Sequence, residues 1–129
     1  MSFKKYLPPR KRSDKPIVAL RRKQLQLNKK CQTFLKDAEF TELYFDEENK
    51  IIGIKPKNEE TDDSIKINIY PRRSIAVIAA SHFINYIAEI SELDFDVRNS
   101  DGKKAGERSI QFIAEWDDQN KMITVKLKK

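Results

Sequence analysis

Ten residues occur twice in this chain, and the repeat restricts the folds that the sequence can adopt. The segment DEENKIIGIK at 46–55 matches DDQNKMITVK at 117–126, 71 residues further on. The identical positions are Asp46/Asp117, Asn49/Asn120, Lys50/Lys121, Ile52/Ile123 and Lys55/Lys126. Each copy joins an acidic, turn-forming start to an alternating apolar run, which is the pattern of a β-hairpin. A repeat in a chain of 129 residues predicts one domain with internal symmetry.

The rest of the chain can be arranged around these two hairpins. We expect an α+β domain, mainly β, in which two pseudo-symmetric strand-strand-helix-strand-strand repeats pack as one small domain. The repeats are expected over 16–56 and 64–127, joined by an acidic linker at 57–63. Residues 1–15 contain Lys, Arg and Pro clusters and are predicted to form a flexible basic arm.

Alternating apolar residues place the individual elements. Strands are predicted over 17–20, 24–27, 41–46, 50–55, 64–70, 75–78, 93–97, 109–116 and 121–127. Asn28 is a favourable N-cap for a short helix over 29–36, and a second helix is predicted over 79–90. Pro56 is expected to end its strand, and residues 99–107 are expected to form a mobile loop.

Composition sets the class of protein. With 39% apolar and 36% charged residues, the chain can bury one modest core. The one cysteine, Cys31, excludes an internal disulfide and favours a reducing compartment. The N-terminal sequence lacks the apolar region of a secretory signal, and no apolar run approaches the ~20 residues of a membrane helix. We therefore expect a cytoplasmic protein without a membrane partner. Association with a nucleoid is compatible with this location.

The basic residues are concentrated at one end of the chain. Residues 1–30 contain eleven Lys or Arg and one acid, whereas the remaining residues contain 15 bases and 19 acids. The net charge of +6 is therefore the difference between a strongly basic start and an acidic body. A basic arm on an acidic body is typical of proteins that bind polyanions. The alternative is that the arm is a solvated tail that only aids solubility.

Residues 17–56, IVALRRKQLQLNKKCQTFL…TELYFDEENKIIGIKP, resemble the AbrB/SpoVT-type swapped-hairpin DNA-binding superfamily. The shared features are a strand, a basic turn, a capped short helix, and a final strand that ends in IKP. Two such units in one chain resemble the arrangement of the MraZ family. This resemblance implies DNA binding by an oligomer. It would place the DNA contacts in the two turns, at Arg21, Arg22 and Lys23 and at Arg72 and Arg73.

A second resemblance depends on the order of elements alone. From 41 onward, four strands precede one long helix, and this order is similar to a unit of the Whirly and PUR class of single-strand binders. No sequence motif accompanies it. The implied ligand is again a nucleic acid, so the two resemblances differ in fold and in strandedness.

The sequence contains little that indicates catalysis. His82 is the single histidine, and with Cys31 as the single cysteine a zinc site of the usual type is excluded. A Cys–His nucleophile pair would require these two residues to meet across the halves. The three glycines form no phosphate-binding motif. The acids at the repeated turns could be imagined around a cation, but turn formation explains them better. We expect no enzyme activity, no cofactor and no small-molecule substrate.

Four aromatic residues lie next to charged sequence. Trp116 and Tyr44 precede the two repeated turns and are expected to anchor the hairpins in the core rather than to stack on bases. Tyr6 in the basic arm and Tyr70 beside Arg72 adjoin cations, so they are the better stacking candidates.

The leading hypothesis is a nucleic-acid-binding protein, a transcriptional regulator or architectural factor that binds DNA rather than RNA and forms homo-oligomers. The predicted contacts are Lys4, Lys5, Arg10, Lys11, Arg12, Lys15, Arg21, Arg22, Lys23, Lys29, Lys30, Arg72 and Arg73. The alternative is a non-enzymatic assembly component, associated with a virion, ribosome or polymerase. The acidic residues 59–63 and open strand edges would then make its contacts.

Overall fold

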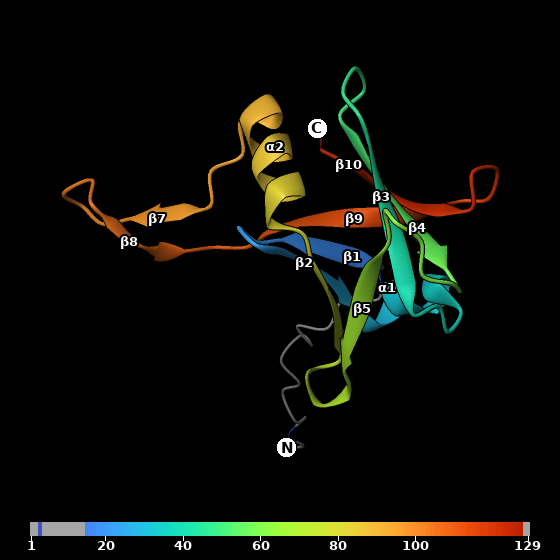
Figure 1. The fold of residues 1–129 in the computed structure, drawn as a ribbon. Coiled ribbons are helices and arrows are strands. Elements are labelled where there is room, and N and C mark those ends of the chain that lie inside the picture. The colour runs from blue at the N-terminus through green and yellow to red at the C-terminus, as the bar shows by residue number, and fades with distance from the viewer. Residues whose placement is uncertain (1–2, 4–14, 128–129) are drawn as a thin grey trace.

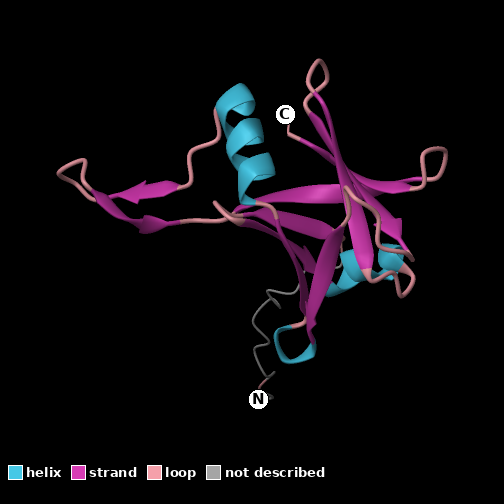
Figure 2. Ribbon diagram, in the orientation of Figure 1, coloured by secondary structure: helices cyan, strands magenta, loops and turns pink. Residues whose placement is uncertain are grey.

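The computed structural model describes residue 3 and residues 15–127, so the arm predicted over 1–15 lies almost wholly outside the described residues. Figures 1 and 2 show the arrangement of its elements. The strands are β1 (Ile17–Leu20), β2 (Gln24–Asn28), β3 (Phe40–Asp46), β4 (Ile51–Lys57), β5 (Ile65–Tyr70), β6 (Ile75–Ala79), β7 (Asp96–Arg98), β8 (Lys104–Glu107), β9 (Ile110–Asp117) and β10 (Met122–Lys126). The helices are α1 (Lys29–Gln32) and α2 (Ser81–Ser91), with 3-10 turns η1 (Thr33–Leu35) and η2 (Pro71–Arg73).

Eight strands close into one antiparallel barrel in the order β1-β2-β6-β5-β3-β4-β10-β9. The predicted α+β fold of two strand-strand-helix-strand-strand repeats is therefore wrong, because the protein is 47% strand and 18% helix and its barrel is shared by both halves. Hairpins β1–β2 and β3–β4 alternate around the barrel with β5–β6 and β9–β10. A separate repeat would leave its hairpin edges unpaired, and each edge instead pairs with a hairpin from the other half.

The core fills the barrel interior. Alternate residues of β2 and β10 point inward, as the period of a strand requires. The fully buried side chains include Leu25, Ile52, Ile54, Ile123 and Val125. An eight-stranded barrel is just wide enough for such side chains to fill its interior, so this centre is packed core and not a channel.

The repeated hairpins adopt the turn that their sequence predicts. Asp46 accepts hydrogen bonds from the backbone N–H of Asn49 at 3.1 Å and from its side-chain amide at 2.9 Å. Asp117 accepts the same two bonds from Asn120, at 3.2 and 2.8 Å. The residue after each Asn, Lys50 or Lys121, has positive φ. The Asp, the Asn and the Lys that follows it are identical in the two copies, and these three residues build an Asx-type turn.

The two copies also pair with each other. β4 lies beside β10, with Ile52 opposite Val125 and Ile54 opposite Ile123. Since Ile52 and Ile123 are equivalent in the repeat, this register relates the two strands by a local two-fold axis near Gly53. A Cβ on Gly53 would lie 2.4 Å from the Met122 sulfur, so the Met122 side chain would have to move to admit a larger residue.

Most of the predicted elements occur. Two predictions are corrected: the strand end at Pro56 and the loop over 99–107. Pro56 does not end β4, which continues to Lys57. β10 pairs only with Ile51–Ile54, so one edge of β4 is open at Pro56, and proline is tolerated at such a position. The loop predicted over 99–107 contains β8, which pairs with β7.

The strands β7 and β8 form a two-stranded ribbon that projects from the barrel beside α2 (Figure 1). The strand predicted over 93–97 is therefore displaced, with Phe95 buried at the base of the ribbon. At that base the Arg108 N–H donates to the Phe95 carbonyl at 2.8 Å.

No helix among residues 15–127 is long and apolar enough to cross a membrane.

Candidate nucleic-acid interface

One end of the barrel brings the first half's short helix next to the β5–β6 turn. β2 pairs with β6 so that Asn28 lies opposite Ile75. From α1, the Gln32 side-chain amide donates to the Leu27 carbonyl and to the Ser74 carbonyl, each at 3.3 Å. Residues 29–32 and 71–74 are therefore neighbours in space although they are about forty positions apart in the sequence.

The Asn28 side chain connects a third segment to this end. Its oxygen accepts hydrogen bonds from the Cys31 N–H at 2.9 Å, as the predicted N-cap of α1, and from the Ile17 N–H at 3.0 Å. Its amide group donates to the Lys15 carbonyl at 2.9 Å. One side chain thus caps the helix and fixes the point at which the N-terminal segment joins the barrel.

These three segments carry five of the predicted nucleic-acid contacts. We call this surface the basic end, and it comprises Lys15, Lys29, Lys30, Tyr70, Arg72 and Arg73. Apart from Lys15, its cations lie on exposed positions and form no ion pair with any described carboxylate. A cluster of cations without acidic partners favours an anionic ligand.

Tyr70 gives the basic end an aromatic surface. The Arg73 guanidinium lies 6.0 Å from the centre of the Tyr70 ring, within the range of a cation–π interaction. The ring is 45% exposed, and the preceding Ile69 is 55% exposed. The predicted stacking candidate therefore lies on the surface, beside a cation.

Three other predicted contacts lie at the opposite end of the barrel. Arg21, Arg22 and Lys23 form the β1–β2 turn, and the Lys23 carbonyl accepts a hydrogen bond from the Ala80 N–H just before α2. Because β2 runs from Gln24 to Asn28, its length separates this turn from the basic end. The structure thus divides the cations that the sequence grouped together.

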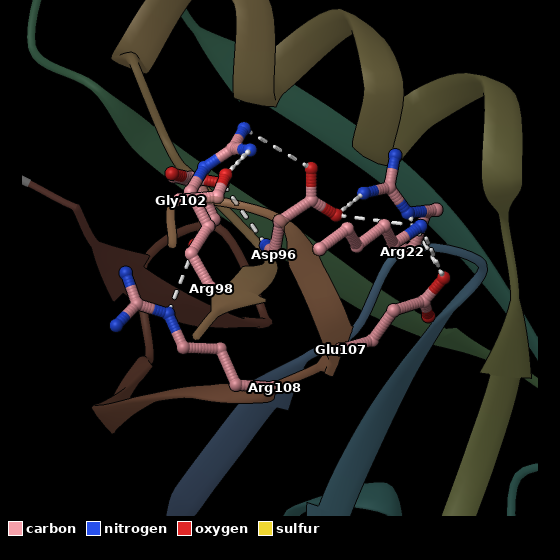
Figure 3. A network of polar contacts seen from close by, with 8 residues as sticks. Arg22, Asp96, Arg98, Gly102, Glu107 and Arg108 are labelled. Atoms are coloured by element: carbon pink, nitrogen blue, oxygen red, sulfur yellow. Dashed lines mark hydrogen bonds and ion pairs between the residues drawn. The ribbon is translucent and has the colours of Figure 1, made fainter. Parts of the chain in front are cut away.

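Arg22 is held by acids of the ribbon, as Figure 3 shows. Its guanidinium forms an ion pair with Asp96 and a second contact, from Nε to the Glu107 carboxylate, at 3.2 Å. The Glu107 contact lacks hydrogen-bond geometry, and Nε has no other partner within the described residues. Lys104 also lies 3.5 Å from Asp96 and 3.7 Å from Glu107. We call Arg22, Asp96, Lys104 and Glu107 the ribbon clamp.

The clamp changes the titration of its central acid. Burial against the barrel acts to raise the pKa of Asp96, but the charges of Arg22 and Lys104 outweigh it and the pKa is lowered. Asp96 is therefore ionised at neutral pH and neutralises Arg22. This pairing makes Arg22 less available to a phosphate than the cations of the basic end.

Six predicted residues lie outside the described part of the chain, so the structure does not place them: Lys4, Lys5, Tyr6, Arg10, Lys11 and Arg12.

The acidic groups have structural partners in the turns. The hydrogen bonds from Asn49 and Asn120 lower the pKa of Asp46 and Asp117 respectively. Within residues 15–127, no group of three His, Cys, Asp or Glu side chains is placed to hold a metal ion. The geometry of the repeated acids is that of turn formation, as the sequence favoured.

The aromatic residues before the turns differ from each other. Trp116 stacks on Phe34 with ring centres 5.7 Å apart, which agrees with the predicted anchoring role. Tyr44 does not enter the core: it is 46% exposed, and its hydroxyl donates to Glu42 at 3.0 Å. Tyr44 lies opposite Gly53 in the pairing of β3 with β4.

The cysteine and the histidine are far apart. Cys31 follows the Asn28 end of β2, whereas His82 follows Ala79, which pairs with Gln24 at the other end of β2. The two side chains therefore do not form a nucleophile pair. Burial raises the pKa of the Cys31 thiol to about 12, so it is protonated and unreactive at neutral pH. His82 lies beside Lys23 and Ser81 in a shallow hollow of about 560 Å³ at the start of α2.

Two residues next to the basic end were not predicted from the sequence. Gln32 joins α1 to the β5–β6 turn, and nothing in its local sequence indicates a partner 42 positions away. Ile69 belongs to an alternating run that predicts burial, but it lies where β3 no longer pairs with β5.

Comparison of the chain with protein-family models, curated proteins and solved structures found no match.

Proposed function

We propose that this protein binds nucleic acid through the basic end. The observation that supports this function best is the convergence of Lys29, Lys30, Arg72 and Arg73 from two separate segments without a described carboxylate partner. In the acidic turns, Asp46 and Asp117 accept hydrogen bonds from Asn49 and Asn120, and Asp118 pairs with Lys121. Lys and Arg bind phosphates and release counterions, which supplies affinity without sequence selectivity.

The proposal predicts a defined salt dependence. If the protein neutralises about five phosphates of a duplex, the logarithm of the binding constant falls with the logarithm of salt concentration with a slope of about −4.5. Fluorescence anisotropy with a labelled 20-mer, single-stranded and duplex, measures this slope at several salt concentrations. Absence of binding to both probes at low salt would exclude the function.

Two matched double variants locate the interface. Lys29→Gln/Arg72→Gln removes one Lys and one Arg from the basic end, and Arg21→Gln/Lys23→Gln removes the same charges from the β1–β2 turn. We expect the first variant to lose about 1.8 from the slope on duplex and to bind on the order of 50-fold more weakly at 0.1 M salt. The second variant should change affinity by less than about fivefold. Equal losses would show that only net charge matters.

A second function, assembly through protein contacts, is favoured by the ribbon. Two strands that project from a barrel present open edges, and open edges can pair with another chain. The partner that we would test is a second copy of this protein. Light scattering on the intact chain, and on a variant with two glycines in place of residues 97–106, distinguishes the cases: assembly through the ribbon predicts a dimer that becomes a monomer.

A further inference from the structure

The end of β5 exposes apolar surface that its sequence pattern does not predict. Ile69 and Tyr70 are consecutive, and both are about half exposed. The other exposed tyrosines of the described chain have different surroundings: the Tyr44 hydroxyl bonds to Glu42, and the Tyr86 ring lies edge-on to Phe45. Tyr70 is the one described tyrosine with a cation over its ring.

The exposure has a structural cause in the strand pairing. β3 pairs with β5 only at Phe40 opposite Lys66 and Thr41 opposite Ile65. One further bond, from the Ile67 N–H to the Glu39 carbonyl at 2.9 Å, extends the contact. Beyond that bond β3 does not pair with β5, so the last residues of β5 have a strand neighbour on the β6 side alone. Successive side chains of a strand point to opposite faces, so Ile69 and Tyr70 are exposed on different sides of β5, and Tyr70 lies directly before η2.

The Tyr70 ring and its neighbouring cations match the chemistry of an unpaired nucleotide. An unstacked base offers a π face that can stack on an aromatic ring and add to the affinity. In a duplex the same faces are already stacked on their neighbours. Arg72 and Arg73 follow Tyr70 directly, so their guanidinium groups can reach the phosphates that flank a base stacked on Tyr70.

We propose that the basic end binds single-stranded nucleic acid in preference to duplex, with Tyr70 stacking on a base and the arginines of η2 contacting the adjacent phosphates. This proposal rests on the proposed function and adds the class of ligand. The cations of α1 continue the phosphate path across the barrel end.

The test compares two tyrosines of equal exposure. Tyr70→Ala and Tyr44→Ala each remove an exposed tyrosine, but only the first lies at the basic end. Binding of labelled oligo(dT) 12-mer and of a 12-base-pair duplex is measured by fluorescence anisotropy at several salt concentrations. We expect the native protein to bind oligo(dT) at least tenfold more tightly than duplex.

For the variants we expect Tyr70→Ala to bind oligo(dT) about tenfold more weakly with an unchanged salt slope, because no phosphate contact is lost. Tyr70→Phe should retain the native affinity, since the ring remains, and it also shows that the site still folds. Tyr44→Ala should bind like the native protein. Equal effects of the two alanine variants, or duplex binding as tight as oligo(dT) binding, would overturn the single-strand preference and leave the proposed function standing. Failure of the native protein to bind either probe at low salt would overturn both.

Discussion

The two ends of the barrel carry similar numbers of cations in very different surroundings. At one end, Lys29, Lys30, Arg72 and Arg73 are exposed without described acidic partners. At the other, Arg22 lies between Asp96 and Glu107 of the ribbon (Figure 3). Both ends contain a basic turn between two strands, RRK at 21–23 and PRR at 71–73.

The difference lies in what each turn meets after folding. The β1–β2 turn faces a ribbon with its own carboxylates, whereas the β5–β6 turn faces a helix whose first two residues are lysines. A basic sequence therefore indicates an anion site only where folding brings no acid to it. Variants that change one end of the barrel at a time measure what that end contributes to stability or to binding.

The largest effect is expected from the side chain that assembles the basic end. Asn28→Ala removes the helix cap and both links to the N-terminal segment, and we expect the free energy of unfolding to fall by about 2 kcal/mol. Asn28→Asp is the control, because a carboxylate still accepts from Ile17 and Cys31 and loses only the donation to Lys15. Urea unfolding of both variants measures the difference. Equal destabilisation would mean that the accepted bonds contribute little.

A smaller effect should follow from releasing the cation of the clamp. Asp96→Asn/Glu107→Gln leaves Arg22 without an ionised partner among these acids, so it becomes available to a phosphate. One added contact should make the salt slope on oligo(dT) steeper by at most about 0.7, and binding should tighten by less than about fivefold at 0.1 M salt because the β1–β2 turn lies at the other end of the barrel. Glu60→Gln/Asp62→Asn makes the same charge change in the linker before β5. A similar gain there would attribute the effect to net charge.

Removal of Arg22 itself should act locally on the ribbon. In Arg22→Ala the two ribbon acids lose a shared partner, and a two-stranded ribbon has little stability of its own. We expect ribbon amides to exchange with solvent less than about fivefold faster and barrel amides to be unaffected. Arg21→Ala, one residue away, should change neither. Faster exchange throughout the barrel would show that the clamp supports the whole fold.

The smallest effect is expected from lowering the pH, which should weaken the ribbon clamp and leave the basic end unchanged. The pKa of Asp96 is lowered in the folded protein, so its contribution to the clamp is present above the pKa of a free aspartate, about 3.9, and is lost as pH falls through its lower folded value. The protection of the ribbon amides, measured relative to intrinsic exchange at the same pH, should therefore fall at pH below about 3.9. α1 and η2 lie at the other end of the barrel from Asp96, so they should show no such change. Constant ribbon protection down to the pH of global unfolding would contradict the clamp.

Local features of the fold were predictable from the sequence, and the pairing of distant segments was not. The Asp46 and Asp117 turns and the Asn28 cap each depend on residues within a few positions, so the sequence pattern is sufficient. The order in which hairpins close the barrel depends on edges that all carry similar apolar alternation. Nothing in that alternation selects β6 as the partner of β2.

The same limit applies to the candidate site. Cations, and Tyr70 beside them, were recognisable because their residue types define the chemistry. Their availability was not recognisable, since Arg22 and Asp96 are 74 positions apart and Glu107, on the other ribbon strand, was expected to lie in a loop. The exposure of Ile69 likewise depends on where a different strand stops pairing.

The position of Lys15 has a consequence for the strength of any contact made at the basic end. Asn28 holds the Lys15 carbonyl, so residues 1–14, with five further cations, are covalently attached beside Lys29 and Arg72. Once a polyanion occupies the basic end, the effective concentration of those tethered cations around it depends on the length of the tether and not on the amount of protein in solution. If the basic end binds a polyanion as proposed, the joint at Asn28 would let the two segments act as one bivalent unit.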